Sequence, residues 1–248
     1  MKVSVVLPTY NEKQNIAKLI KQIKQEFSKD KGLDCEVIVV DDNSPDNTAE
    51  TVRKIIPNLN NRKFSLKLIL RTREKGLPTA VMTGMDKATG DFVCAMDTDL
   101  SHPVSHLHEM VMRCLDPEIH LVNATRWGKN GGMKSAFSSK VLSIVINKSL
   151  SKSLKLPYTD FTGGFFVIDR SLYAKLNQKE KEFIFKESDY GEYFIKFIAV
   201  VHQKKANAVE MPFVYVARVK GQSKTSVLKH GKLYVNAIKD IKRWQKKS

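Results

Sequence analysis

Two carboxylates one residue apart, Asp97 and Asp99, directly follow the apolar run at residues 92–96. If that run is a strand, its alternation points both side chains to the same side, and ligands of open α/β sheets sit beyond the carboxyl ends of strands. Paired carboxylate oxygens suit a hard divalent cation, Mg²⁺ or Mn²⁺, that shares its shell with substrate phosphates. Ser101 could add a hydroxyl or a bound water. The pattern predicts a metal site at Asp97, Asp99 and Ser101; the alternative is a solvated acidic turn.

Polar clusters also end two earlier apolar runs, and this repetition favours a built site over a solvated turn. The candidate residues are Pro8, Tyr10 and Glu12 after residues 3–7, and Asp41 and Asp42 after residues 36–40. Right-handed crossovers between parallel strands bring the carboxyl ends of those strands to one rim. Glu12 and Asp42 can accept hydrogen bonds from a base or a ribose, and Tyr10 offers a flat stacking face. Asp41 has a simpler alternative, because aspartates often cap their own turns.

The elements that must position these groups alternate between strand and helix in the first half of the chain. The expected strands are 3–7, 36–40, 66–70 and 92–96, and the expected helices begin near residue 16, span 48–56 up to Pro57, and span 76–88. In the second half we expect helices at 106–115 and 192–202, strands at 121–124, 165–168 and 209–216, and a lysine-rich segment at 136–156. This rhythm predicts an α/β fold with a mainly parallel central sheet flanked by helices.

Composition restricts the class of protein. The chain has 248 residues, 42% of them hydrophobic and 8% aromatic, which is typical of globular proteins. It has no apolar run of the roughly 18 residues that span a membrane, and an apolar strand directly follows Met1, so we expect no transmembrane segment and no secretory signal. Three cysteines without metal-ligand spacing indicate reduced thiols in a cytoplasmic protein.

The net charge of +16 points to an anionic partner: a membrane surface, phosphorylated substrates or nucleic acid. After residue 218, nine lysines and arginines stand against one acidic residue, Asp240. Apolar residues at helical spacing within this segment predict a basic helix at 219–248, which either lies on an anionic membrane or packs on the domain with a solvated basic face. The nucleic-acid hypothesis is weaker, since no helix-turn-helix, zinc or RNA-binding signature is visible.

Several motifs together resemble the inverting family-2 glycosyltransferases with the nucleotide-diphosphosugar (GT-A) fold. They are VVLPTYNE at 5–12, VVDDNSPD at 39–46 and MDTDLSHP at 96–103. TRW at 125–127, NGG at 130–132, DFTGGF at 160–165 and RVKGQSK at 218–224 resemble more closely the branch of the family that acts on polyprenyl phosphates. The resemblance covers nearly the whole chain. It implies one catalytic domain at 1–218, with a nucleotide-sugar-binding half at 1–125 and an acceptor-side half at 126–218.

The resemblance also implies roles for individual residues. Those implied to bind the nucleotide sugar are Pro8, Tyr10, Glu12, Val40, Asp42, Asp97, Thr98, Asp99, Arg126, Arg218 and Lys224, and the implied catalytic set is Asp97, Asp99, Arg126, Arg218 and Lys224. Arginine presents a planar fork that suits phosphate oxygens. Relatives often carry an arginine four residues before an acceptor-side serine; here the serine is Ser143, Ser139 takes the arginine's place, and Lys140 is the candidate substitute.

The implied reaction is inverting transfer of mannose from GDP-mannose to a polyprenyl (dolichyl) phosphate, with Mg²⁺ or Mn²⁺. No convincing general base is visible: His102 follows the acidic pair but precedes Pro103, so a structural role in the turn is an equal alternative. A phosphate acceptor is already largely dianionic at neutral pH and needs no base. The open alternatives are glucose or another sugar from a UDP donor, and a glycan or protein hydroxyl as acceptor. We expect a peripheral protein on the cytoplasmic face of a membrane, attached by surface helices or a membrane-anchoring partner subunit.

Overall fold

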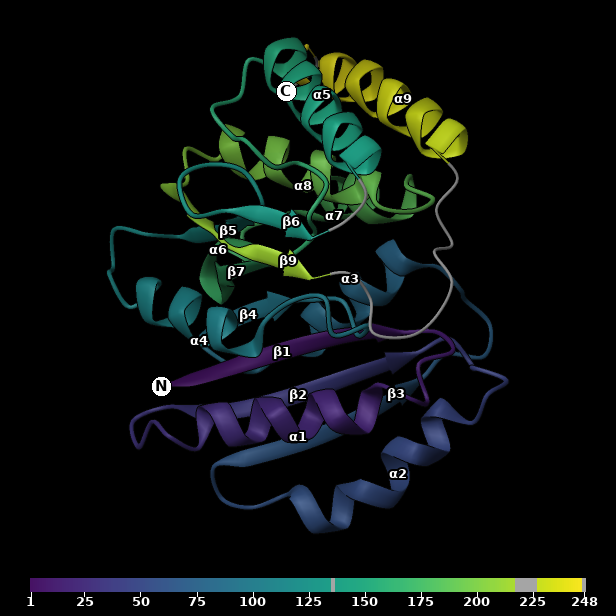
Figure 1. Ribbon diagram of the computed structural model, residues 1–248, viewed down its shortest axis with the longest axis vertical. Coiled ribbons are helices and arrows are strands. Elements are labelled where there is room, and N and C mark those ends of the chain that lie inside the picture. Colours follow the sequence, from purple (N-terminus) through teal and green to yellow (C-terminus); the bar gives the residue numbers. More distant parts are fainter. Residues whose placement is uncertain (135–136, 217–226, 247–248) are drawn as a thin grey trace.

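The computed structural model describes residues 1–134, 137–216 and 227–246, with the side chains of 227–230 left out. A seven-stranded sheet with the order β3-β2-β1-β4-β7-β5-β8 runs through the molecule (Figure 1). Its strands are β1 (Lys2–Thr9), β2 (Asp34–Asp41), β3 (Phe64–Leu70), β4 (Phe92–Ala95), β5 (Leu121–Thr125), β7 (Phe166–Asp169) and β8 (Ala208–Pro212). Only β7 runs antiparallel to its neighbours, so the predicted α/β fold with a mainly parallel sheet is confirmed.

Helices cover both faces of this sheet. The hydrophobic core on one face lies under α1 (Ile16–Phe27), α2 (Thr48–Leu59) and α4 (Val104–Arg113). The core on the other face lies under α3 (Leu77–Lys87), α5 (Phe137–Leu154), α8 (Glu192–Gln203) and α9 (Val227–Gln245). The short helices α6 (Arg170–Ala174) and α7 (Gln178–Lys181) and a π-helical turn, η1 (Glu182–Lys186), connect β7 to α8.

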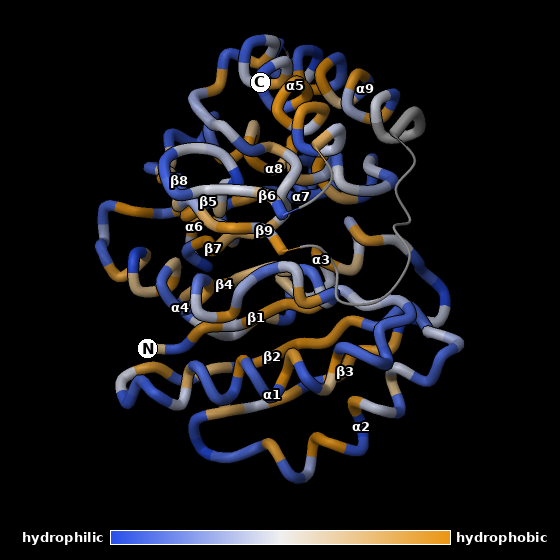
Figure 2. Tube along the Cα trace, in the orientation of Figure 1, coloured by the Kyte–Doolittle hydropathy of each residue, from blue (hydrophilic) through white to orange (hydrophobic). Residues whose placement is uncertain are grey.

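The sequence pattern explains this layering. The central strands β1 and β2 are buried almost throughout, as parallel strands covered on both faces must be, and they appear as hydrophobic stretches in Figure 2. Successive residues alternate between the two cores: Val5 packs under α1 and Val6 packs under α3. Helix α3 approaches β1 so closely that a Cβ at Gly84 would overlap Val6.

Two expectations from the sequence are wrong in detail. Helix α2 continues past Pro57 to Leu59, because a proline in the last turn removes a single intrahelical bond while Ile55, Ile56 and Leu59 still pack on the core. The expected strand at 209–216 is two strands. After β8 the chain leaves the large sheet, and β9 (Val214–Val216) pairs in parallel with the unpredicted β6 (Gly132–Lys134).

The basic C-terminal helix α9 packs against the domain. Ala237 and Ile241 are buried, Trp244 stacks on Phe183 at 4.5 Å, and Asp240 lies 3.9 Å from the buried Lys196. The exposed face carries Lys232, Lys239, Lys242, Arg243 and Lys246. Within the residues described here, the C-terminal helix therefore packs on the domain and leaves its basic face exposed. Across the same part of the chain, every helix is too short or too polar to cross a bilayer.

Candidate functional site

A cavity of about 310 Å³ opens at the carboxyl ends of β1, β2 and β4. It is lined by Pro8, Thr9, Tyr10, Glu12, Asp42, Lys75, Gly76, Leu77, Ala80, Asp97, Thr98, Asp99, Asp189 and Tyr190. Three separate strand ends thus meet at one rim, as the crossover rule predicts. We call this space the first cavity; its size lies within the range of small-molecule sites.

Arg71 holds one wall of the first cavity, although the sequence analysis did not single it out. Its Nε donates to Asp42 Oδ1 at 2.6 Å, its Nη1 donates to Thr79 Oγ1 at 2.8 Å, and its Nη2 donates to the Gly76 carbonyl at 2.9 Å. Asp42 Oδ2 accepts from the Gly76 N–H at 2.7 Å. Asp42 is therefore first a structural anchor for the loop before α3. The one sign of Arg71 in the sequence is its position directly after a predicted strand.

The acidic pair sits on a tight turn after β4. Leu100 has a φ of +66°, which costs energy for a side chain of that kind, and Asp99 Oδ1 accepts from the Ser101 N–H at 3.1 Å. His102 accepts the Asp97 N–H through Nδ1 at 3.2 Å and stacks on Phe165 at 4.5 Å. Burial lowers the pKa of His102 to about 4, so the ring is neutral and suited to accept. His102 therefore has the structural role in the turn.

The donor set of the first cavity fits a divalent cation that shares its shell with a ligand. Asp97 and Asp99 both line the cavity. Ser101 does not line it, and its hydroxyl is buried nearby without a hydrogen-bond partner in the part of the chain that the structure describes. Within that same part, no cluster of three or more acidic, histidine or cysteine side chains forms a closed cage. Mg²⁺ and Mn²⁺ typically bind one or two protein carboxylates, and substrate phosphates then complete the coordination of the ion.

Two of the sequence candidates on β2 lie elsewhere. Val40 is fully buried in the core beside Pro8 and does not line the first cavity. Asp41 is also buried, and its carboxylate accepts both the N–H and the hydroxyl of Ser44. Asp41 thus caps its own turn, as the alternative reading expected.

A larger cavity of about 610 Å³, the second cavity, lies beside α5. Its lining includes Lys140, Ile144, Lys148 and Lys152, which recur every four residues and so share one face of the helix. Arg126, Trp127 and Tyr158 also line this cavity. Lys140 therefore lines a cavity together with Arg126. Ser143 is on the same helix, and its carbonyl accepts from Asn147 at 2.9 Å.

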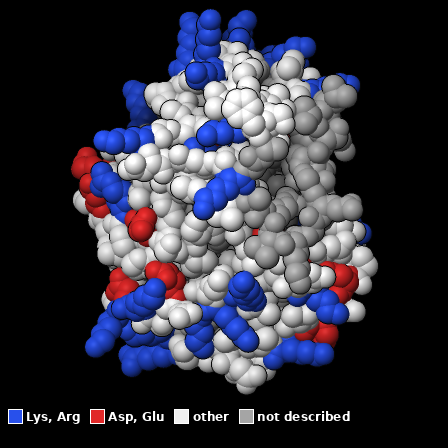
Figure 3. Space-filling model, viewed as in Figure 1, with Lys and Arg blue, Asp and Glu red and all other residues white. Residues whose placement is uncertain are grey.

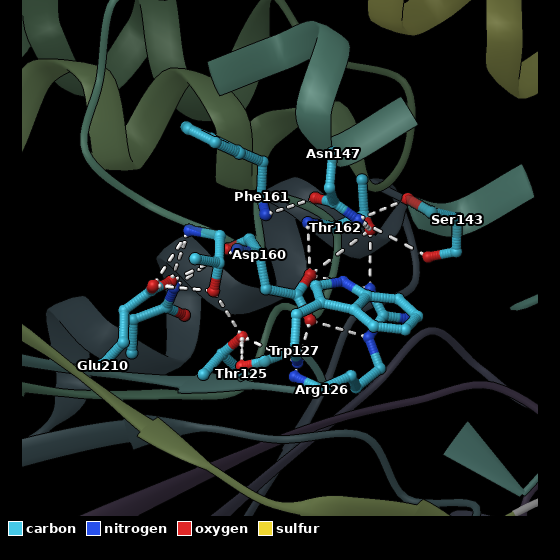
Figure 4. Close-up of polar contacts among 11 residues, drawn as sticks. Thr125, Arg126, Trp127, Ser143, Asn147, Asp160, Phe161, Thr162 and Glu210 are labelled. Atoms are coloured by element: carbon cyan, nitrogen blue, oxygen red, sulfur yellow. Dashed lines mark hydrogen bonds and ion pairs between the residues drawn. The ribbon is translucent and has the colours of Figure 1, made fainter. Parts of the chain in front are cut away.

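Arg126 lines the second cavity rather than the first, and a buried aspartate fixes its position (Figure 4). Its Nε donates to Asp160 Oδ2 and its Nη2 to Asp160 Oδ1, both at 2.7 Å. Burial disfavours the charged guanidinium, but the Asp160 carboxylate outweighs that effect and raises the pKa of Arg126. The guanidinium also lies 5.6 Å from the ring of Trp127.

The structure thus divides the candidates between two cavities. Pro8, Tyr10, Glu12, Asp42 and the Asp97–Asp99 segment share the first, and Arg126 and Lys140 share the second. Arg218 and Lys224 lie outside the described residues. Three further residues of the first cavity were not predicted from the sequence. Lys75 lies 5.9 Å from the ring of Tyr10, and Asp189 and Tyr190 come from the loop before α8.

The chain is similar in sequence to known mannosyltransferases. The chain is 29% identical over 250 residues to a dolichol-phosphate mannosyltransferase of Pyrococcus furiosus, covering 99% of this chain and 64% of that protein. It is 27% identical over 247 residues to the dolichol-phosphate mannosyltransferase of Saccharomyces cerevisiae, covering 96% of this chain and 85% of that protein. The chain therefore spans somewhat less than two thirds of the Pyrococcus relative.

Solved structures share the fold. Glucosyl-3-phosphoglycerate synthase from Mycobacterium tuberculosis, in complex with Mn²⁺, UDP and phosphoglyceric acid, superposes with a TM-score of 0.69 at 16% identity, over 97% of this chain and 77% of that one. The mannosyltransferase PcManGT from Pyrobaculum calidifontis, in complex with GDP-Man and Mn²⁺, gives 0.59 at 24% identity, over 89% and 58%. The Glycosyl transferase family 2 profile matches residues 4–176. The motifs, the sheet with its acidic rim and this match lead to one conclusion: the chain belongs to glycosyl transferase family 2.

Proposed function

We propose that this glycosyltransferase transfers mannose from GDP-mannose to a polyprenyl (dolichyl) phosphate with inversion. The observation that carries the proposal is the pair of cavities, because one offers carboxylates for a metal-bound diphosphate and the other offers cations for an anionic acceptor. The names of three curated relatives, all dolichol-phosphate mannosyltransferases, support the same sugar and acceptor.

The first cavity is the proposed donor site. Pro8, Tyr10, Glu12 and the loop that Asp42 anchors would surround the nucleoside, with Tyr10 stacking on the base. The Glu12 carboxylate already receives the Asn15 amide at 2.8 Å, which holds it in place to accept from base or ribose. The sequence resemblance adds Arg218 and Lys224 as cations for the diphosphate, and both stay predictions outside the described residues.

Asp97 and Asp99, with Ser101 nearby, are the proposed ligands of Mg²⁺ or Mn²⁺. When bound, such an ion stabilises the negative charge that develops on the departing diphosphate. Complexes of fold relatives with Mn²⁺ are consistent with this assignment. The protein's own contribution is to hold the two carboxylates on a rigid turn, through the Leu100 backbone and the His102–Asp97 hydrogen bond.

The second cavity is the proposed acceptor site. Arg126, Lys140, Lys148 and Lys152 give it a positive lining that would neutralise the acceptor phosphate as it approaches another anion. Ser143 is the neighbouring hydroxyl on the same helix. The second pKa of a phosphate ester is near 6, so the acceptor attacks without transferring a proton to the protein. His102 is buried, and its Nδ1 already accepts the Asp97 N–H, which agrees with a reaction that uses no histidine base.

We also propose that the protein is peripheral on the cytoplasmic face of a membrane, and helix α5 supports attachment to a membrane surface. Phe137, Val141 and Val145 are 81%, 42% and 55% exposed and lie four residues apart on one face. Lysines flank this stripe, and Figure 3 shows basic side chains with no acidic ones in view at the end of the molecule where α5 and α9 lie, whereas basic and acidic side chains are mixed at the opposite end. Exposed apolar residues beside lysines suit a helix at an anionic lipid surface, where each nearby cation contributes roughly 1 kcal/mol. The occupant of this face is therefore the bilayer that holds the acceptor.

A panel assay tests the proposed function. Labelled GDP-mannose, UDP-glucose and GDP-glucose are each incubated with a short polyprenyl phosphate and Mn²⁺, with and without EDTA, and the lipid is extracted. We expect labelled lipid with GDP-mannose and none in EDTA. Preference for the UDP donor would show that the transferred sugar is not mannose. Full activity in EDTA would reject the metal assignment.

A further inference from the structure

The hydrogen bonds around Arg126 form a network in which nearly every donor and acceptor is already used. Asp160 is fully buried. Its Oδ2 accepts the backbone N–H of Arg126 at 3.0 Å in addition to Nε, and its Oδ1 accepts the Thr162 N–H at 3.1 Å in addition to Nη2. The second N–H of Nη2 goes to Thr162 Oγ1 at 2.7 Å.

Thr162 is the central hydroxyl of this network. A hydroxyl has two acceptor positions and one donor. Thr162 Oγ1 accepts from Arg126 and, at 3.2 Å, from the Asn147 amide, and it faces Asp160 Oδ1 at 3.5 Å. Its capacity is therefore fully used, and removing the hydroxyl leaves a buried N–H of Arg126 without an acceptor.

Asn147 connects this network to helix α5. It is buried, its carbonyl accepts the Phe161 N–H at 2.7 Å, and its amide donates to Thr162 and to the carbonyl of Ser143 at 2.9 Å. Figure 4 shows Asn147 between the helix and the loop that carries Phe161 and Thr162. The helix with the lysines of the second cavity and the loop that fixes Arg126 are thus joined through one side chain.

One edge of the Arg126 guanidinium makes no hydrogen bond within the described part of the chain. A guanidinium has five N–H donors, and Nε and Nη2 use three of them on Asp160 and Thr162. Nη1 makes no hydrogen bond to any residue that the structure describes, and Arg126 lines the second cavity. We propose that Asp160, Thr162 and Asn147 are positioning residues that hold Arg126 so that its Nη1 edge receives the phosphate of the acceptor, in register with the lysines of α5. This inference rests on the proposed function for the identity of the acceptor.

The test compares two variants of one position. Thr162→Val removes the hydroxyl at nearly constant shape, and Thr162→Ser keeps it. Thr83→Val is the matched control, because it removes a threonine hydroxyl that donates to a helix carbonyl in α3, and Thr83 lines neither cavity. Binding of a short-chain prenyl phosphate is measured by calorimetry, and transfer kinetics are measured with donor and acceptor varied separately. Asn147→Asp, which replaces the donating amide by an oxygen, is a second variant.

We expect Thr162→Val to weaken prenyl phosphate binding about tenfold, the scale of one hydrogen bond to a charged group. The KM for the acceptor should rise by a similar factor, while the KM for the nucleotide sugar stays within twofold. Thr162→Ser and Thr83→Val should bind like the wild type, and Asn147→Asp should resemble Thr162→Val. Where Asn147→Asp fails to fold, the Thr162 pair decides.

Several results would overturn the inference. They are unchanged acceptor binding in Thr162→Val, an equal loss of donor and acceptor affinity, and a Thr162→Ser variant as impaired as Thr162→Val. A wild type that binds the prenyl phosphate but transfers no sugar to it would reject the proposed function alone, because the binding comparison still tests the positioning of Arg126. A wild type that binds no prenyl phosphate would reject both.

Discussion

The ion pair between Arg71 and Asp42 makes a quantitative prediction. The side chains are only 6% and 8% exposed, and Arg71 also bonds Thr79 and the Gly76 carbonyl. Arg71→Met keeps much of the apolar length of the side chain but leaves the Asp42 carboxylate buried with the Gly76 N–H as its remaining partner in the network described above. The loop that forms one wall of the first cavity then loses its anchor.

The magnitude follows from this geometry. Removing one partner of a buried pair costs about 3–5 kcal/mol, and the surviving Gly76 bond places this variant near the lower end, at about 3 kcal/mol. For a chain of this size that corresponds to a fall in Tm of roughly 6–12 °C. Affinity for GDP should fall as well, because the loop lines the first cavity. Arg113→Met is the matched control: its pair with Asp116 is exposed and should be worth at most about 1 kcal/mol.

A double-mutant cycle measures the pair itself. Unfolding free energies are determined for the wild type, Arg71→Met, Asp42→Asn and the double variant, and GDP binding is measured by calorimetry with Mn²⁺. We expect a coupling energy above about 1.5 kcal/mol, since contacting residues in one network are not additive. Two results would show that the ion pair does not anchor the loop. They are effects that add within about 0.5 kcal/mol, and a loss of unfolding free energy in Arg71→Met no larger than that in Arg113→Met.

Three further predictions concern the metal, acid stability and the membrane. Asp99→Ala should lower turnover at least about 100-fold in Mn²⁺, and near wild-type turnover in a rate assay would remove Asp99 from the metal site. Burial raises the pKa of Glu36, but hydrogen bonds from Lys67, Ser4 and Thr89 outweigh it and lower the pKa to about 2; this stabilisation is complete above the ordinary value of 4.5 and is lost as the pH falls toward 2. In denaturant unfolding, the free energy of unfolding of Glu36→Gln should therefore depend on pH by about 3 kcal/mol less than that of the wild type. The same dependence on pH in both proteins would contradict the role of Glu36. Phe137→Asp should weaken sedimentation with anionic vesicles at least about fivefold, Met112→Asp on the opposite layer should not, and equal effects would reject α5 as the docking face.

The rim of the sheet could be predicted from the sequence because each polar cluster directly follows an apolar run. Strand alternation and crossover handedness then suffice to bring Tyr10, Glu12, Asp42 and Asp97 into one cavity without any long-range information. The alternative reading for Asp41 was also available, since its capping partner, Ser44, is three residues away.

The second cavity was beyond the reach of such reasoning. The partners of Arg126 lie 34 and 36 residues away in the chain, on a loop whose position depends on tertiary packing. Likewise, β6 and β9 are three-residue strands that form only with each other, so neither has a pattern of its own. Arg71 was missed for a different reason: an arginine after a strand is common, and only the burial of Asp42 distinguishes this one.

The proposed transfer to a phosphate is tested most directly with two acceptors of the same chain length, a polyprenyl phosphate and the corresponding polyprenol. Each is incubated with labelled GDP-mannose and Mn²⁺, and the extracted lipid is counted. A cavity lined by Arg126 and lysines, in a reaction without a general base, predicts labelled lipid from the phosphate and none above background from the alcohol. Equal labelling of both acceptors, or labelling of the alcohol alone, would contradict transfer to a phosphate without a general base.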